Sequence, residues 1–312
     1  MKWALLAEAR SLWRRIDSDH ITDSWRIHIP RLLVLLTAAQ LVAARSADEY
    51  VTNVLEAQGI NAAPLGAVRP GAFTESASDG RPLDTLLAQP VSTTLVALHN
   101  GETRSRAMAA GWATLDMILS TQVADGFRGS ASVAMGVRPR CTQYVRTLVP
   151  PSCSRCVILA GTESWSTAFK RHPRCDCTAV PTDQFQSKHL TTNPKVHFEN
   201  LSKAEQDRVF TKAGAQAIRD GADINRVVNA RRRAAGLTPA QSRTVIPADV
   251  RAARGDFTRG RLRADGQGRF LTAELSGRQQ GLVRPMPETI YAMARNRAEA
   301  IELLRKHRYI TQ

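Results

Sequence analysis

The stretches Cys153-Ser-Arg-Cys156 and His172-Pro-Arg-Cys175-Asp-Cys177 hold four of the five cysteines of this 312-residue chain. A Cys-x-x-Cys turn points two thiolates at one centre, and residues two apart on an extended segment project from the same strand face. The four sulfurs can therefore converge, and zinc accepts such a tetrahedral set at about 2.3 Å per bond. A site with four protein ligands has no open position for catalysis, so this metal would be structural.

The histidine in the second stretch leaves the ligand set open. Zinc could take all four sulfurs, or three sulfurs and the His172 imidazole with one thiol left over, and the spacing does not choose between them. Reduced thiols near a turn, or a Cys153–Cys156 disulfide, fit the same pattern. Thioredoxin-like redox chemistry is disfavoured, because Pro150 and Pro151 precede the first pair and the β-prone residues 157–159 follow it.

The composition predicts a mostly helical protein in a reducing compartment. Hydrophobic residues make up 43% of the chain and aromatic residues only 5%, and Ala and Leu dominate the apolar content. An odd, clustered cysteine set is typical of a cytosolic protein, with Cys141 read as a small buried residue. The longest apolar run, residues 32–44, is short of the about 20 residues that span a bilayer, so no membrane partner is expected.

The net charge of +15 is concentrated near the C-terminal end. Residues 226–308 hold 17 Arg and one Lys against seven acidic residues, a net charge of +11. Arginine suits phosphate and carboxylate contacts, so a polyanion or an acidic protein surface is the expected partner. The alternative is a merely solvated arginine-rich face. The candidate nucleic-acid contacts are Arg231, Arg232, Arg233, Arg251, Arg254, Arg259, Arg261 and Arg263.

Helical periodicity dominates the first 135 residues and predicts a bundle of long helices. Helices are expected at 3–16, from Pro30 to Gln58 with Gly59 as a stop, and at 83–99 and 102–125, with a hinge at 60–82.

The remaining chain is predicted to hold a small α+β cysteine module at 136–235 and a basic region at 236–312. In the module, a hairpin would pair residues 144–148 with 157–159, and a further strand would run over 175–180 until Pro181 ends it. A capping box at Ser202 and Glu205 would begin a helix that runs to Gly221, followed by a short helix at 222–234. An irregular arm at 236–284 and two helices near 286–294 and 296–307 would close the chain.

The cysteine pattern resembles that of a known family. Cys153-x-x-Cys156 and His172-Pro-Arg-Cys175-Asp-Cys177-Thr-Ala-Val-Pro181 resemble the Cys-x-x-Cys … His-Pro-x-Cys-x-Cys … Pro signature of phage Mu protein F-like minor head proteins. Residues 201–223 and 227–232 look like the versions carried by tailed phages of actinobacteria. The resemblance extends through roughly residues 100 to 310.

The resemblance implies a non-enzymatic virion component, a minor capsid protein needed for head morphogenesis. It would be present in few copies, as part of an oligomeric assembly at the portal vertex, and assembled in the host cytoplasm. The portal protein or the major capsid protein would be its direct partner. Packaged DNA would be bound without sequence preference, in agreement with the basic arm. The family signature falls on Cys153, Cys156, His172, Cys175 and Cys177, with zinc as the implied structural metal.

Two other functions compete with this interpretation. A capsid maturation protease would need a nucleophile and a base, and His172, His189 and His197 lie near many serines. The chain has no Gly-x-Ser-x-Gly and no His-Glu-x-x-His sequence. A zinc-containing nucleic-acid-binding regulator would need a recognition helix soon after Cys177, where the sequence is rich in Pro, Thr and Asn until Leu201.

Overall fold

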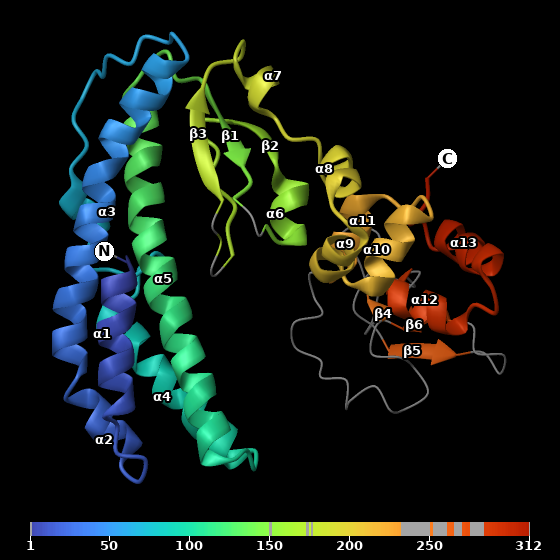
Figure 1. Cartoon of the computed structure of the whole chain (residues 1–312), viewed down its shortest axis with the longest axis horizontal. Helices are drawn as coiled ribbons and strands as arrows, with labels where there is room; N and C mark the ends of the chain where they lie inside the picture. The colour runs from blue at the N-terminus through green and yellow to red at the C-terminus, as the bar shows by residue number, and fades with distance from the viewer. Residues whose placement is uncertain are drawn as a thin grey trace. The chain divides into compact units, whose positions relative to one another are not determined.

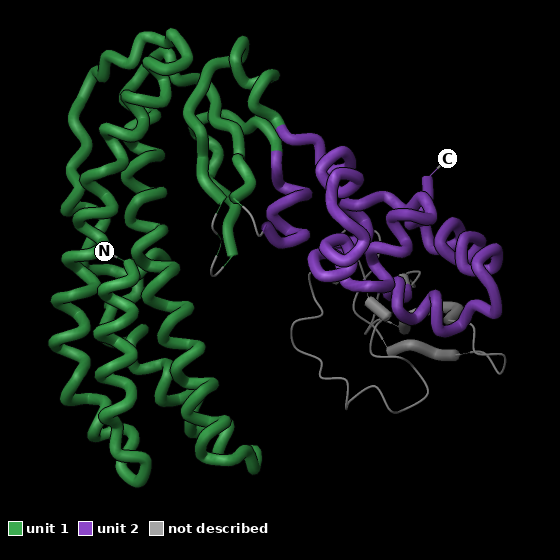
Figure 2. The backbone as a smooth tube through the Cα atoms, viewed as in Figure 1, with its two compact units in different colours: residues 1–149, 161–191 green, residues 150–160, 192–312 purple. Residues whose placement is uncertain are grey.

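The computed structural model describes residues 2–149, 152–172, 175, 177–231, 250–251, 261–264, 270–274 and 284–311, with only the backbone at 231, 250–251, 261–264, 270–274 and 284. The chain divides into two compact units, residues 1–149 with 161–191 and residues 150–160 with 192–312 (Figure 2). The structure is mainly helical with a small three-stranded antiparallel sheet and a cysteine cluster, which confirms the predicted fold class. The division into three regions at 135 and 235 stays a prediction.

Long helices make up most of the first unit (Figure 1). All four helices predicted before residue 135 are present, the last of them extends beyond its predicted end at 125, and one short helix is added. The loop predicted at 60–82 contains a 3-10 turn, η1, at Pro70–Phe73. The helices are α1 (Lys2–Arg14), α2 (Ile21–Arg26), α3 (Ile29–Ala57), α4 (Leu83–His99) and α5 (Arg104–Gly136).

Helix α3 follows the start and stop signals of its sequence. Pro30 occupies the first turn, where its missing N–H has no helical partner to lose. Gly59 adopts a φ of +72° just past the end, a conformation that costs glycine little. Buried residues three or four apart, from Leu32 to Leu55, form a stripe. Among the described helices, α3 is the one long and apolar enough to cross a membrane by length and composition.

Two tryptophans anchor the core of the first unit. The Trp13 and Trp25 rings meet edge to face with centroids 5.1 Å apart, and the Trp25 indole N–H donates to the Leu87 carbonyl at 2.8 Å. Both rings are buried, so each combines a large apolar area with a satisfied donor. The core that they join includes Leu5, Leu12, Leu32, Leu36, Leu83, Leu87, Leu115 and Leu119.

Helix α5 approaches α4 closely at Gly111. A Cβ atom at this position would lie 2.0 Å from Thr94 Oγ1, 2.5 Å from Trp13 Cζ2 and 2.9 Å from the Pro90 carbonyl oxygen. These distances are shorter than van der Waals contact, so only a residue without a side chain fits between the helices.

The sheet has the order β2-β1-β3, with both pairings antiparallel. Its strands are β1 (Gln143–Thr147), β2 (Gly161–Ser164) and β3 (Thr178–Thr182). The strand predicted at 157–159 is wrong, because these residues belong to helix α6 (Ser154–Leu159). The Cys153 side chain caps this helix, and this cap outweighs the β propensity of Val157 and Ile158.

Strand β3 contains Pro181 instead of ending before it, which corrects the predicted boundary. Since β3 is an edge strand, the missing N–H of Pro181 is not needed in the ladder. Helix α3 holds this edge: Tyr50 Oη donates to the Ala179 carbonyl at 3.0 Å, and Gln58 Nε2 donates to the Pro181 carbonyl at 2.8 Å. The short helix α7 (Ser187–Leu190) follows β3.

The second unit is built from short helices. The predicted capping box at Ser202 and Glu205 is present, and both helices predicted after residue 285 are confirmed. The single helix predicted to reach Gly221 is broken at Thr211, which has a φ of +64° and caps the next helix. Apart from α6, these helices are α8 (Pro194–Asn200), α9 (Lys203–Phe210), α10 (Lys212–Arg219), α11 (Ile224–Arg231), α12 (Pro287–Met293) and α13 (Arg297–Lys306).

A polar contact ties α10 to the last two helices. Asp220, 9% exposed, accepts hydrogen bonds from Tyr291 Oη at 2.6 Å and Arg297 Nε at 2.8 Å. Burial favours the neutral acid, but the bonds from Tyr291, Gln216 and Arg297 outweigh it and hold the pKa of Asp220 below its ordinary value. Asp220 is therefore a charged anchor inside this unit.

The predicted irregular arm is described only in part, and the described pieces are short strands. Strand β4 (Val250–Arg251) pairs with β7 (Arg284–Pro285), and β5 (Arg261–Ala264) pairs with β6 (Phe270–Glu274), both antiparallel. The rest of the arm lies outside the described residues.

Replacing Gly111 with Ala is expected to destabilise the protein by about 1–3 kcal/mol, because the added methyl group forces α4 and α5 apart. Gly71→Ala is the matched control, since nothing lies within 4 Å of a Cβ at that position. Urea denaturation of both variants checks this. Equal unfolding midpoints for the two variants would contradict the close approach at Gly111.

Candidate metal centre

The first cysteine pair is organised by the start of helix α6. Cys153 is the N-cap residue with φ −77° and ψ 159°, and its Sγ accepts a hydrogen bond from the backbone N–H of Cys156 at 3.3 Å. The two cysteines therefore lie one helical turn apart at the same end of α6. An N–H group directed at sulfur favours its anionic, metal-binding form.

The sheet register brings the second pair to the same end of strand β1. Helix α6 lies in the connection from β1 to β2, which starts after Thr147 and ends at Gly161, opposite Arg146. Strand β3 begins at Thr178, opposite Thr147, directly after Cys177. Both cysteine segments thus adjoin the last two residues of β1 because of the antiparallel pairing on its two sides.

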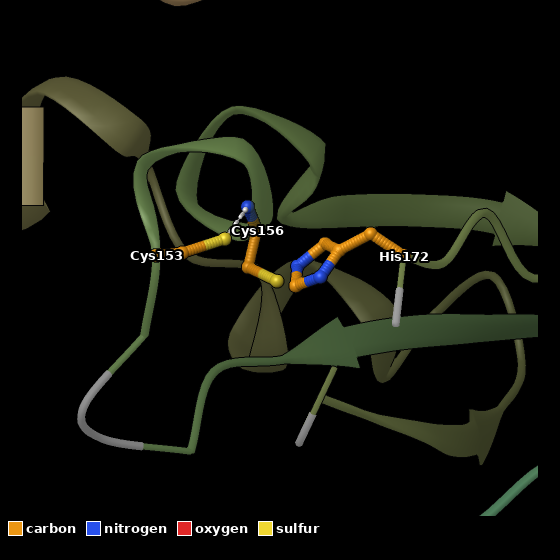
Figure 3. A group of neighbouring side chains, drawn as sticks. All are labelled: Cys153, Cys156 and His172. Atoms are coloured by element: carbon orange, nitrogen blue, oxygen red, sulfur yellow. Dashed lines mark hydrogen bonds between the residues drawn. The ribbon is translucent and has the colours of Figure 1, made fainter. Parts of the chain in front are cut away.

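The five predicted metal ligands form two overlapping groups. Cys153, Cys156 and His172 make one, and Cys156, Cys175 and Cys177 make the other. Within each group the sulfur and ring nitrogen atoms lie within 4.8 Å of one another. Figure 3 shows the first group, with the Cys156 sulfur facing the His172 ring.

The donor atoms suit zinc in type and in spacing. Sulfurs around a tetrahedral zinc with 2.3 Å bonds lie about 3.8 Å apart, so shifts of about 1 Å bring either group to that geometry. The three cysteines of the second group are 2–3% exposed. Thiolates and imidazole are ligands that zinc prefers. These clusters can therefore hold a metal ion. Cys156 is the residue that belongs to both groups.

A buried arginine lies directly beside the second group. Arg146, 3% exposed, places Nη1 3.8 Å from Cys175 Sγ, and its Nη2 donates to the Lys170 carbonyl. Its guanidinium also lies over the Phe169 ring at 3.9 Å from the centroid. A zinc ion with three or four thiolates carries a net negative charge, so the Arg146 charge compensates it.

A second arginine fixes the backbone of the ligand segment. Arg128 Nη2 donates to the carbonyl of Cys175 and, at 3.1 Å, to that of Cys177. Asp125 is 8% exposed, and its Oδ1 forms ion pairs with Arg128 Nη1 at 3.2 Å and with Arg171 Nε at 2.6 Å. Helix α5 therefore positions Cys175 and Cys177 through Arg128. Through Asp125 it also positions Arg171, which is next to His172 in the chain.

Sequence reasoning missed these supporting residues. A signal existed for Arg146, which shares a strand face with Tyr144 in the predicted strand at 144–148, an unusual place for a charge. Asp125 and Arg128 have the spacing of a helical ion pair, which gives no hint of a partner 47 residues further along the chain.

The structure narrows the alternatives for the cysteines. All five are thiols, so no Cys153–Cys156 disulfide is present. Cys141 lies outside both groups and is buried, as predicted, and burial raises the pKa of its thiol to about 11. Cys153 and Cys156 lie at the start of helix α6, after the partly buried strand β1. The expectation that no helix begins at this pair, which disfavoured thioredoxin-like chemistry, is therefore wrong. However, the strands on either side of α6 are antiparallel, and thioredoxin-like motifs need a βαβ unit.

The predicted nucleic-acid contacts are not tested by side-chain geometry. Arg231, Arg251, Arg261 and Arg263 are described only as backbone, at the end of α11 and in β4 and β5. Arg232, Arg233, Arg254 and Arg259 lie outside the described residues.

Comparison with known proteins adds no assignment: the chain matches no protein-family model, no curated protein and no solved structure.

Proposed function

We propose that the protein is a non-enzymatic minor capsid protein of a tailed bacteriophage, with a zinc-stapled cysteine module. The observation that carries the proposal is that all five residues of the Mu F-like signature fall in the two overlapping ligand groups. A short motif can match by chance. The grouping of all its cysteines and its histidine supports a common role for them.

The chemistry of the cluster favours a structural role. The five candidate ligands form two groups of three that share Cys156, and a zinc ion bound by four of them would have no position left for water or substrate. In this role zinc joins the turn at 153–156 to the segment at 172–177. Both segments lie next to short strands in the chain. Such a staple suits a protein that must keep its shape inside an assembly. The proposed partners are the portal protein or the major capsid protein.

The basic C-terminal region supports a second contact, with packaged DNA. Residues 226–308 carry a net charge of +11, and a protein in the head lies beside dense phosphate. Phe257 and Phe270 are the only aromatic rings from 226 to 285, so base stacking contributes little and the contact would be electrostatic.

Zinc binding is tested by metal analysis of the purified protein. We expect about one zinc per chain, and loss of stoichiometric zinc with a lower melting temperature in Cys153→Ser and in Cys175→Ser. Cys141→Ala is the matched control, because Cys141 is a buried thiol outside both groups, and it should keep its zinc. Native mass spectrometry measures all four proteins. Zinc absent from the wild type, or retained by both serine variants, would exclude the staple.

Two further variants identify the ligand set. His172→Asn keeps zinc if four sulfurs bind it and loses zinc if the imidazole is a ligand. Cys156→Ser should lose zinc, because we expect the residue that belongs to both groups to be a ligand. Zinc retained by Cys156→Ser would show that Cys156 is not a required zinc ligand.

The DNA contact predicts binding that weakens steeply with salt. Neutralising six to ten phosphates lowers affinity by about 10³–10⁵ between 50 and 200 mM salt, and deletion of residues 226–284 should abolish binding. Fluorescence anisotropy with two unrelated duplexes measures this. Salt-independent binding argues against the electrostatic contact, and strong preference for one duplex favours the zinc-containing regulator instead.

The virion assignment is tested by locating the protein. We expect it in purified particles at few copies per head, and absent or reduced in particles assembled without portal protein. Mass spectrometry of both particle types provides the copy number. Absence from portal-containing virions rejects the proposed function without bearing on zinc binding.

A further inference from the structure

Helix α3 carries an apolar surface that the core of its own unit does not use. Of its most apolar 18 residues only 28% are buried, whereas a surface helix ordinarily keeps the face opposite the core polar. Val34 is 70% exposed and Val42 is 42% exposed. Figure 1 shows α3 at the edge of the first unit. Exposed residues three or four apart form the outer stripe of α3: Arg31, Val34, Ala38, Val42, Arg45 and Glu49. A contiguous exposed apolar surface marks a contact with another molecule.

The outer stripe is too short and too charged for lipid. Its apolar part runs from Val34 to Val42, about 12 Å along the helix axis, whereas the hydrocarbon core of a bilayer is about 30 Å thick. Arg31 and Arg45 bound this part on its two sides. The opposite face of α3 is packed in the core, where Leu36 is fully buried. A protein surface is therefore the expected occupant.

The charges of the outer stripe are complementary to the same stripe running in the opposite direction. Eighteen residues make five full turns of an α-helix, so Arg31 and Glu49 point in the same direction. In an antiparallel pair of α3 helices centred at residue 40, Arg31 of each copy lies opposite Glu49 of the other, and Ala38 lies opposite Val42. A parallel pair would place Arg31 against Arg31 and Glu49 against Glu49, and like charges repel. The complementary occupant is thus a second copy of this chain.

The side chains of the outer stripe suit such a pair. Ala38 is small, so the two helices can approach closely where the Val42 side chain of the other copy packs. Arg31 already pairs with Glu8 of α1 at 2.6 Å, yet its side chain remains 66% exposed. A guanidinium group has five N–H donors, so Arg31 can bind Glu49 of the other copy as well.

We propose that the protein forms an isologous dimer in which the outer stripes of two α3 helices pack antiparallel. A contact of one helix per copy lies near the lower limit of about 1,000 Å² for a specific interface, so we expect a dissociation constant of about 1–100 μM. The dimer depends neither on zinc nor on the capsid role, so its failure would leave both standing.

Sedimentation equilibrium of the full-length protein at about 1–100 μM tests the dimer. We expect reversible dimerisation of the wild type. Val42→Glu should weaken it at least about tenfold, because a carboxylate then enters the apolar contact twice. Val196→Glu is the matched control, since Val196 of α8 is 51% exposed and lies outside the stripe. A wild type that is monomeric at about 100 μM, or equal effects of the two variants, overturns the proposal. Monomeric protein that floats with phosphatidylglycerol vesicles would assign the stripe to a membrane instead.

Reversal of the end charges tests the antiparallel direction. Glu49→Arg should weaken the dimer about tenfold, because it faces Arg31 of the other copy at both ends. Adding Arg31→Glu to the same chain should restore the dissociation constant to within about threefold of the wild type. Both positions are exposed, so these variants keep the test decisive even if Val42→Glu fails to fold. A double variant as weak as Glu49→Arg, or a Glu49→Arg protein that dimerises like the wild type, overturns the proposal.

Discussion

Strand β1 hydrogen-bonds to a neighbour on each side, and this double pairing is the constraint on which the cysteine cluster depends. Its last residues, Arg146 and Thr147, lie opposite the first residues of β2 and β3. Because both neighbours run antiparallel to β1, the connection carrying Cys153 and Cys156 and the segment carrying Cys175 and Cys177 adjoin the same end of the sheet. A register shift of one residue would turn Arg146 to the other face and move its charge away from Cys175.

The long helices support this end of the sheet through a small number of buried polar contacts. Arg128 of α5 donates to the carbonyls of Cys175 and Cys177. Tyr50 of α3 and Gln58, at the end of α3, donate to carbonyls of β3. One carboxylate oxygen of Asp125 holds both Arg128 and Arg171. The glycines of α5 let α4 and Phe73 approach this helix closely.

A closed metal cluster on such a frame is consistent with a protein whose task is to hold a shape. The short strands around it give few hydrogen bonds, so a tetrahedral metal would contribute a large share of the local stability. The long helices and the basic C-terminal region belong to different parts of the chain, and they suit the protein contact and the polyanion contact of the proposed minor capsid protein.

The sequence by itself determined the long helices and the candidate ligands. Periodicity and the signals at Pro30, Gly59, Ser202 and Glu205 act over one or two turns, so they located α1, α3, α4, α9 and the closing helices without tertiary information. Local β propensity failed at 157–159, where a cap formed by the Cys153 side chain favours a helix, and the backbone at Thr211 breaks a helix that the pattern continues. Only the tertiary structure decided that Arg128, Arg146 and Asp125 support the cysteine cluster. Strand pairing and helix packing bring together residues that lie far apart in the chain, and such contacts leave no pattern in the local sequence.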